Sequence, residues 1–469
     1  MKYFSTRGND GPLGYEEALL SGLARDGGLY LPESYPAFSP DEIRAMADLS
    51  YAALAGRIMA RFTDGEIDEA ELAAMAEDAY AGFSDPAVAP LKHLSGNIHV
   101  LELFHGPTIA FKDYAMQFLS RAFDRALRAA GQQAVILGAT SGDTGSAALE
   151  AFRGRDSVDI FILFPEGRVS PVQQRQMTSV DAAGAHAVAV AGDFDDCQAI
   201  VKQLFNNHGF RDQVNLSAVN SINWARLMPQ IVYYFSSALA LGAPDRKVAF
   251  SVPTGNFGNV FAGYVAMRMG LPIERLIVAS NRNDILTRFF EQGAMQRDSV
   301  VPSLSPSMDI QVSSNFERLL FELMERDGSA VADIMDRFAE TGMFTLPDRA
   351  MAAAHAHFSA YRLDDDGTLA EIAATMAGEG MCLDPHSAVG VAAARRAIAD
   401  GTVGSDTPVV ALACAHPAKF EAAVTKATGT APALPTHLAD LMMRPEKMQK
   451  VAASGEAVRD LVLTQRRNV

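Results

Sequence analysis

The sequence predicts an α/β protein with doubly wound, mainly parallel sheets, preceded by a helical N-terminal region. From about residue 97 onward, short apolar segments alternate with segments whose apolar residues have helical spacing. The short segments are almost continuously apolar, which is typical of parallel strands covered by helices on both faces. Before residue 95, by contrast, the apolar residues follow helical spacing.

The N-terminal region is expected to contain helices within residues 14–24, 39–62 and 68–83. Ser39, followed by Pro40 and two acidic residues, is a suitable N-cap for the second of these. The turn "FSDPAVAP", residues 83–90, then separates this region from the next.

Six apolar segments, each followed by a helical pattern, are expected to be the strands of the parallel sheets. They cover residues 134–139, 158–165, 185–192, 214–219, 247–253 and 275–280. Ligands of such sheets bind beyond the carboxyl ends of the strands, so the loops that follow these segments are the first candidates for a functional site.

Composition excludes several functional classes. The chain has 40 Lys and Arg against 56 Asp and Glu, a net charge of −16 that disfavours binding to nucleic acid and to anionic membranes. Its longest apolar-leaning run, residues 231–244, is too short to cross a membrane. The N-terminus has no signal or transit pattern, and only three cysteines occur, so we expect a cytoplasmic protein without disulfides or a metal site.

Lys112 stands in an unusual position for a lysine. In "LFHGPTIAFKD", residues 103–113, it directly follows Ile109, Ala110 and Phe111. An amphipathic helix would explain this pattern structurally. A lysine held in a dry pocket would instead have a lowered pKa and would act as a nucleophile toward carbonyl carbons.

Two glycine-containing loops follow expected strands. "TSGDTGSAA", residues 140–148, follows the first strand and is rich in hydroxyl groups. In "PTGNFGN", residues 253–259, Gly255 and Gly258 bracket a turn that opens a helix, a geometry that suits a phosphate. It is neither a P-loop nor a dinucleotide fingerprint, and a purely structural turn would explain it equally well.

A third polar segment, "NSINWARLMPQ", spans residues 220–230 and contains Arg226, which could bind a phosphate through two hydrogen bonds. A helix cap followed by an ion-paired arginine is the structural alternative. Taken together, a reactive lysine and a phosphate loop predict a phosphorylated carbonyl cofactor, pyridoxal phosphate, bound to Lys112 as a Schiff base.

The sequence resembles the threonine synthases of the long, bacterial and fungal type over nearly its whole length. The segments that carry the resemblance are "TRG" near the start, "DGGLYLPESYP", "LFHGPTIAFKD", "ATSGDTGSAA", "FPEGRVSPVQQRQMTSV", "NSINWARL", "VPTGNFGN", "SPSMDIQVSSNFERLLF", "DPHSAVGV" and "AHPAKF". The resemblance implies the fold type II of pyridoxal-phosphate enzymes, similar to tryptophan synthase β. It also implies a lyase that forms L-threonine and phosphate from O-phospho-L-homoserine and water, the last step of threonine biosynthesis.

The resemblance also implies a domain division and a set of site residues. We expect a helical domain over 1–95, a catalytic domain over 96–432 with a smaller subdomain inserted at roughly 135–245, and a helical tail over 433–469. The catalytic residue is Lys112. The cofactor-binding residues are Lys112, Phe111, Asp143, Gly255, Asn256, Phe257, Gly258, Asn259 and Cys414. The substrate-binding residues are His105, Thr108, Thr140, Ser141, Thr144, Asn220 and Arg226.

Two positions depart from the family pattern. Cys414 stands where relatives commonly have a threonine whose hydroxyl meets the pyridine nitrogen, and a thiol is a weaker donor. Asn259 stands where relatives often have aspartate.

Two alternatives stay open at this point: a related lyase or dehydratase that makes 2-oxobutyrate, and a non-catalytic relative that binds the cofactor. We expect a small-molecule substrate as the main partner, and a monomer or homodimer.

Overall fold

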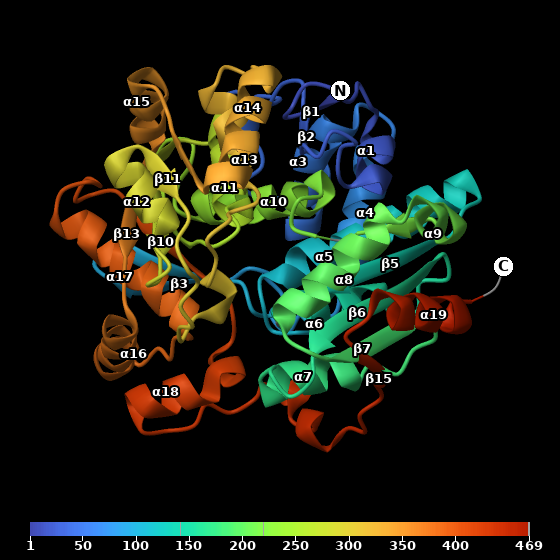
Figure 1. Cartoon of the computed structure of the whole chain (residues 1–469). Coiled ribbons are helices and arrows are strands. Elements are labelled where there is room, and N and C mark those ends of the chain that lie inside the picture. Colours follow the sequence, from blue (N-terminus) through green and yellow to red (C-terminus); the bar gives the residue numbers. More distant parts are fainter. Residues whose placement is uncertain (141, 219, 468–469) are drawn as a thin grey trace.

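The fold is built on two large, mainly parallel sheets that lie side by side (Figure 1). The computed structural model describes residues 1–140, 142–218 and 220–467. In Figure 1 the sheet with five strands lies on the right and the one with six strands on the left.

The six-stranded sheet has the order β13-β10-β9-β14-β4-β3, and its neighbouring strands are parallel except for the edge pair β3 and β4. Its strands are β3 (Leu91–Ser95), β4 (Ile98–Glu102), β9 (Val248–Pro253), β10 (Ile273–Ser280), β13 (Phe358–Arg362) and β14 (Val409–Ala413).

Helices cover both faces of this sheet. Ala249 and Ala411 face α17 (Pro385–Ala399), whereas Phe250, the next residue along β9, belongs to the core cluster that includes α11 (Gly258–Arg268). Because side chains alternate across a strand, a strand between two helical layers must be apolar at every position. All six positions of β9 are buried accordingly.

The five-stranded sheet has the order β15-β7-β6-β5-β8 and is parallel throughout. Its strands are β5 (Ala134–Ala139), β6 (Val158–Pro165), β7 (Ala185–Ala191), β8 (Leu216–Ser217) and β15 (Gln449–Ala452). One face packs against α8 (Phe194–Asn206) and α19 (Gly455–Gln465), and the other against α5 (Lys112–Ala130) and α6 (Asp143–Phe152).

The N-terminal region is helical as expected, but it also contains strands. Its helices are α1 (Tyr15–Ser21), α2 (Pro40–Arg44), α3 (Tyr51–Thr63) and α4 (Glu69–Tyr80). The expected helix at 39–62 is divided in two because Ser50 caps α3 with its side chain. A short antiparallel pair, β1 (Tyr3–Ser5) and β2 (Tyr30–Pro32), was not expected.

The remaining helices connect and cover these sheets. They are α7 (Pro171–Thr178), α9 (His208–Val214), α10 (Trp224–Ala240), α12 (Ile285–Gln292), α13 (Phe316–Leu323), α14 (Gly328–Thr341), α15 (Asp348–His357), α16 (Asp365–Glu379) and α18 (Glu421–Thr428). Short 3-10 turns occupy Pro306–Met308, Pro417–Phe420, Thr436–Leu438 and Leu441–Met443. A two-stranded sheet pairs β11 (Ala294–Gln296) with β12 (Met343–Thr345).

The expectation of a doubly wound α/β fold with a helical N-terminal region is confirmed. Five of the six expected strands are present within one or two residues, while β8 is limited to Leu216–Ser217. In the part of the chain that the structure describes, no helix is long and apolar enough to cross a membrane.

Candidate active site

Lys112 is the first residue of α5, and its surroundings explain its place after an apolar run. Ile109 and Ala110 are fully buried, and Ala110 forms an isolated bridge with Ala415 beyond the end of β14. The N–H of Phe111 also donates to the carbonyl of Cys414 at 2.8 Å. The apolar residues therefore fasten the loop before Lys112 onto the central strand of the six-stranded sheet.

The lysine side chain is only 12% exposed. Burial lowers the pKa of Lys112, Asp143 opposes this effect, and the positive charge of Lys419 reinforces it. Its Nζ also lies 4.8 Å from the centre of the Phe111 ring. Burial and the charge of Lys419 thus shift the pKa of Lys112 downward, the direction that favours a nucleophilic amine over a solvated surface ammonium.

Asp143 begins α6, directly after the loop that follows β5. One carboxylate oxygen, Oδ2, lies 3.6 Å from Lys112 Nζ, and the other, Oδ1, accepts a hydrogen bond from Gln173 Nε2 at 2.7 Å. Burial alone would raise the pKa of Asp143, but the charges of Lys419 and Lys112 hold it well below its usual value. Asp143 is therefore a permanent anion beside the lysine.

Lys419 is a second buried lysine in the site. It lies in the turn after β14, its side chain is 0% exposed, and its Nζ is 2.7 Å from Asp143 Oδ1. The same ammonium donates to the carbonyl of Thr108 at 2.8 Å. In the sequence, "AHPAKF" contributed only to the resemblance, and Lys419 within it was assigned no role. The overlooked signal was the same as for Lys112, a lysine between the apolar residues Ala418 and Phe420.

The glycine loop from Gly255 to Asn259 joins β9 to α11. None of the N–H groups of Gly255, Asn256 and Phe257 donates a hydrogen bond to another residue that the structure describes. Phe257 has a φ of 63°, a turn that leads directly into the N-terminus of α11. Free amides at a helix N-terminus suit a phosphate group.

A segment of the same motif that supplied the resemblance, residues 305–318, holds this loop in place. Ser313 donates to the carbonyl of Gly255 at 2.7 Å, and Asn315 donates to the carbonyl of Asn256 through both its backbone and its side chain. A Cβ at position 255 would lie 2.9 Å from the carbonyl oxygen of Ser307, so only glycine fits there. No pattern in the sequence indicates that these residues act on the loop.

Two of the predicted cofactor residues direct their side chains into the protein. The Phe257 ring packs against Phe316, with 5.2 Å between ring centres. The Oδ1 atom of Asn259 accepts hydrogen bonds from Tyr233 and Tyr234, at 2.6 and 3.0 Å. Its Nδ2 is buried without a hydrogen-bond partner among the described residues, and so remains available for a ligand.

Arg226 lies in the first turn of α10 and is 4% exposed. Burial lowers the pKa of its guanidinium to about 10, and its positive charge in turn lowers the pKa of Lys112. A buried arginine whose charge acts on Lys112 suits an anionic substrate bound next to that lysine. Asn220, which precedes this helix, is exposed and accepts a backbone hydrogen bond from Asn223 at 3.2 Å.

The hydroxyl-rich loop after β5 has a different arrangement from the one its sequence suggested. Thr140 uses its hydroxyl oxygen to accept from the N–H groups of Gly142 and Gly145, at 3.0 and 2.9 Å. Thr144 is half-buried in α6, and Ser141 lies outside the described residues. Thr140 therefore shapes the turn that presents Asp143.

His105 and Thr108, predicted to line the approach to the substrate, also have partners in the protein. His105 Nε2 lies 2.9 Å from Glu102 Oε2, and its Nδ1 lies 3.1 Å from Ser84 Oγ. Thr108 donates its hydroxyl to Asp113 at 2.7 Å. Through its carbonyl, which accepts from Lys419, Thr108 joins the buried network around Lys112.

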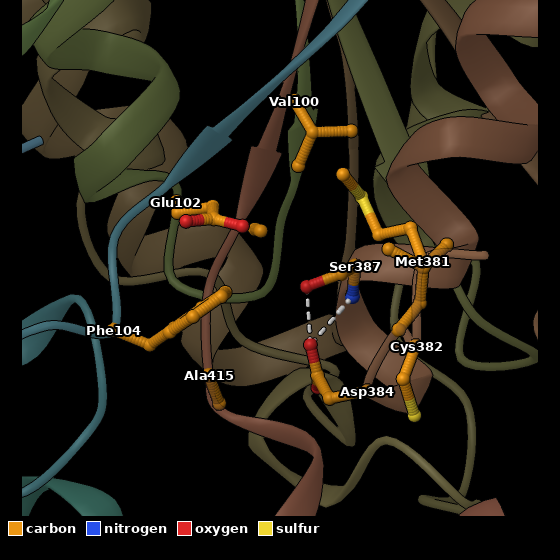
Figure 2. A pocket seen from close by; sticks show the side chains of 10 residues that line it. Val100, Glu102, Phe104, Met381, Cys382, Asp384, Ser387 and Ala415 are labelled. Atoms are coloured by element: carbon orange, nitrogen blue, oxygen red, sulfur yellow. Dashed lines mark hydrogen bonds between the residues drawn. The ribbon is translucent and has the colours of Figure 1, made fainter. Parts of the chain in front are cut away.

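Cys414, at the end of β14, is buried, and burial raises the pKa of its thiol far above the usual value. Its Sγ lies 3.7 Å from the carbonyl of Leu412, and its N–H donates to Ser387 Oγ at 3.1 Å. Figure 2 shows Ser387 in turn directing its hydroxyl and backbone N–H toward Asp384. The thiol is thus a neutral packing group.

A small cavity lies beside Ser387 and Asp384, below the ends of β4 and β14 (Figure 2). Its volume is about 10 Å³, close to the space that one water molecule needs. It is lined by Val100, Glu102, Phe104, Met381, Cys382, Leu383, Asp384, Ser387, Ala413 and Ala415.

His386, at the start of α17, connects Asp384 to the loop that contains Ser307. Its Nε2 accepts from the N–H of Ser307 at 3.2 Å, so the ring proton is on Nδ1, which lies 2.7 Å from Asp384. Ser307 Oγ is 3.4 Å from Asp143 Oδ2. Among the described residues, no group of three or more His, Cys, Asp or Glu could hold a metal ion.

Three family models match the chain. They are described as threonine synthase N terminus over residues 2–80, pyridoxal-phosphate dependent enzyme over 86–366, and threonine synthase, C-terminal, over 387–462. Together they span the helical region, both sheets and the C-terminal strand and helix.

Curated relatives and solved structures agree with these matches. The threonine synthase of Pseudomonas aeruginosa is 53% identical over 448 residues, which cover 95% of each protein. A crystal structure of threonine synthase from Brucella melitensis with bound pyridoxal phosphate has a TM-score of 0.97 and 54% identity over 100% of both chains. The yeast threonine synthase structure has a TM-score of 0.94 and 38% identity, over 99% of this chain and 98% of that one.

Proposed function

The chain belongs to the threonine synthase family, and from this premise we propose how its residues convert O-phospho-L-homoserine and water into L-threonine and phosphate. The enzyme is a pyridoxal-phosphate-dependent lyase, in agreement with its family models and its structural relatives. The assignment of roles depends mainly on one observation, the burial of Lys112. Asp143 lies beside this lysine, and the open glycine loop lies nearby.

The residues present suit the cofactor. The free N–H groups of Gly255, Asn256 and Phe257 and the N-terminus of α11 would hold its phosphate. Lys112 Nζ would bind its aldehyde carbon as a Schiff base, because burial keeps this amine nucleophilic. When bound, pyridoxal phosphate supplies an electron sink that stabilises negative charge at the substrate Cα.

The remaining steps are proton transfers and binding by the chain's own groups. The Lys112 amine would remove and return protons at Cα, Cβ and Cγ of a bound amino acid, because a single flexible amine can reach adjacent carbons. One proton leaves Cα and one leaves Cβ while phosphate leaves Cγ. A proton is then added at Cγ, the hydroxyl of water adds at Cβ, and Cα regains its proton.

Arg226 is proposed to bind the substrate phosphate. A guanidinium can form two parallel hydrogen bonds with a phosphate group, and burial strengthens such bonds because water does not compete for them. Keeping the released phosphate in the site would place an anion where it helps to activate water for the addition at Cβ. The loop hydroxyl groups of residues 140–144 would contribute to the same site.

The roles of the other predicted residues follow from their positions. Phe111 would lie against the cofactor ring, and Asp143 would face the ring hydroxyl. Cys414 would lie near the pyridine nitrogen; as a neutral thiol, it would leave this nitrogen mostly unprotonated. His105, Thr108 and Asn220 would border the substrate.

The domain boundaries, the cellular location and the oligomeric state are also proposals. We place the helical domain at 1–95, the catalytic domain at 96–432 with the insertion at roughly 135–245, and the tail at 433–469. In the structure, this tail contributes β15 to the five-stranded sheet. We propose the cytoplasm as the location, in keeping with three unpaired cysteines, and a monomer or homodimer as the assembly.

The test is the identity of the products. The purified, cofactor-saturated protein is incubated with O-phospho-L-homoserine, phosphate is measured by a colorimetric assay, and the organic product is identified by mass spectrometry. Equimolar threonine and phosphate are expected. Phosphate with 2-oxobutyrate and ammonia would instead assign the chain to the lyase alternative, and no phosphate would contradict the proposed substrate.

A further inference from the structure

Asp143 is shared by two buried lysines that come from opposite sides of the site. It begins α6, after a strand of the five-stranded sheet, whereas Lys419 follows a strand of the six-stranded sheet. Lys419 Nζ lies 2.7 Å from Asp143 Oδ1, while Lys112 Nζ lies 3.6 Å from Oδ2. The closer ion pair is therefore with Lys419, the lysine to which the resemblance gave no role.

The surroundings of Lys419 provide two oxygen partners for its ammonium group. Its side chain is completely buried, and its Nζ contacts two oxygen atoms, one from Asp143 and one from the Thr108 carbonyl. A buried charge is stable only when it is paired and hydrogen-bonded. The second contact reaches the loop that leads into Lys112, so Lys419 connects this loop to the start of α6.

One carboxylate can fully neutralise only one of two neighbouring ammonium groups. We propose that Lys419 is a positioning residue, which takes Asp143 as its ion-pair partner, fixes the carboxylate beside Lys112, and so leaves the Lys112 amine uncharged and reactive. The inference deepens the proposed function, because it rests on Lys112 being the reactive amine.

The charged groups around Lys112 shift its pKa in the directions that this arrangement requires. After burial, the largest effect on the pKa of Lys112 is the upward one of Asp143, followed by the downward effect of Lys419. Cys414 also raises the pKa of Lys112, and Arg226 lowers it. Asp113, the other acidic group near Lys419, is held by Thr108.

The test measures how Lys112 titrates in the full-length protein from which bound cofactor has been removed. Acetic anhydride labels neutral amines, and peptide mass spectrometry gives the labelling rate of each lysine as a function of pH. Lys419→Met removes the charge but keeps most of the side-chain volume. The Lys112 titration should move upward by about one pH unit, which corresponds to a roughly tenfold lower labelling rate below its midpoint.

Three further variants make the result specific. Lys419→Arg keeps the charge and should titrate close to the wild type. Asp143→Asn combined with Lys419→Met removes both charges of the pair, and most of the upward shift should disappear. Lys447→Met is the matched control, because Lys447 also pairs with an aspartate at 2.6 Å, Asp181, but on the surface. It should leave the Lys112 titration unchanged.

The pH profile of kcat for the corresponding holoenzymes provides a second readout, and its acid limb should move upward in Lys419→Met alone. An unchanged Lys112 titration in folded Lys419→Met protein would overturn the inference, as would a shift that persists in the double variant. If Lys419→Met does not fold, Lys419→Gln replaces it, and an unchanged Lys112 titration in that folded variant would overturn the inference. If Lys112 in the wild type labels no more readily than the exposed Lys450, the proposed function itself fails.

Discussion

The side chain of Asn315 donates to the carbonyl oxygen of Asn256 at 2.9 Å, and the backbone N–H of Asn315 donates to the same oxygen at 3.1 Å. This pair of hydrogen bonds holds the Asn256 carbonyl in place without using an N–H group of the glycine loop. The shape of the phosphate site thus depends on a residue 59 positions further along the chain.

Asn315→Ala should therefore weaken cofactor binding. The substitution removes the side-chain hydrogen bond to the loop carbonyl and also the hydrogen bonds with Ser221 and Arg318. Loss of the bond to the loop alone is worth about 1 kcal/mol, so we expect the Kd for pyridoxal phosphate to rise at least about fivefold. Fluorescence or absorbance titration of cofactor-free protein measures this. Asn206→Ala, at an exposed position of α8, is the control and should bind normally. An unchanged Kd in Asn315→Ala would mean that the loop keeps its shape without this contact.

Gly255→Ala should have a larger effect on the same equilibrium. Its Cβ would meet the Ser307 carbonyl at 2.9 Å and the Met308 Cα at 3.2 Å, both backbone atoms that cannot move independently. Displacing the loop or residues 305–310 should reduce cofactor affinity by tenfold or more, at a cost of about 1–3 kcal/mol. At Gly82 an added Cβ meets nothing within 4 Å, so Gly82→Ala serves as the matched substitution. Equal cofactor affinity in both variants would contradict the close approach.

Arg226→Ala should separate substrate binding from cofactor binding. Loss of a charge-assisted pair with the substrate phosphate costs about 2–3 kcal/mol, which corresponds to a roughly 30- to 160-fold higher KM for O-phospho-L-homoserine. The Kd for pyridoxal phosphate should change much less. Steady-state kinetics and cofactor titration give the two numbers, and Arg226→Lys should recover part of the loss. Equal losses in both would assign Arg226 to the cofactor phosphate instead.

Asp113 gives a prediction for the pH dependence of stability. Burial raises its pKa from the usual 3.8 to about 6, so the folded protein binds this proton more tightly than the unfolded chain. The stability contributed by this group is therefore present below pH 4 and is lost as the pH rises to about 6, by up to about 3 kcal/mol. Asp143, whose pKa is lowered, contributes in the opposite direction.

Comparison with Asp113→Asn isolates this effect, because all other groups are common to both proteins. Between pH 4 and pH 7 the free energy of unfolding of the wild type should fall relative to that of the variant, as measured by urea denaturation at each pH. Parallel pH profiles for the two proteins would show that Asp113 titrates as an ordinary carboxyl group.

The sequence could predict the parts of this protein whose signal is local. Strands buried on both faces are continuously apolar, and β5, β6 and β9 were placed within a residue for that reason. Strands at sheet edges carry polar residues and lack this signal, as in β13 and β15, which were not expected. β8 was shortened because Val214, the first residue of the expected strand, ends α9.

The site residues that the sequence could predict are likewise those with a local signal. Lys112 and the glycine loop have a recognisable chemistry in a short segment. Lys419 and Asn315 act through contacts with residues 59 to 311 positions away, and no local pattern encodes such contacts. Thr140 is a further case, since its hydroxyl suggested a ligand contact and the sequence did not show that its oxygen also accepts hydrogen bonds from the loop itself.

The central claim is that Lys112, and not the completely buried Lys419, is the amine that binds the cofactor. The most direct test is to reduce the cofactor-saturated protein with borohydride, digest it and locate the pyridoxyl group by mass spectrometry. We expect one modified peptide, with the group on Lys112, and no such peptide from Lys112→Ala protein that remains folded. A pyridoxyl group on Lys419 or on a surface lysine in the wild type would contradict this account.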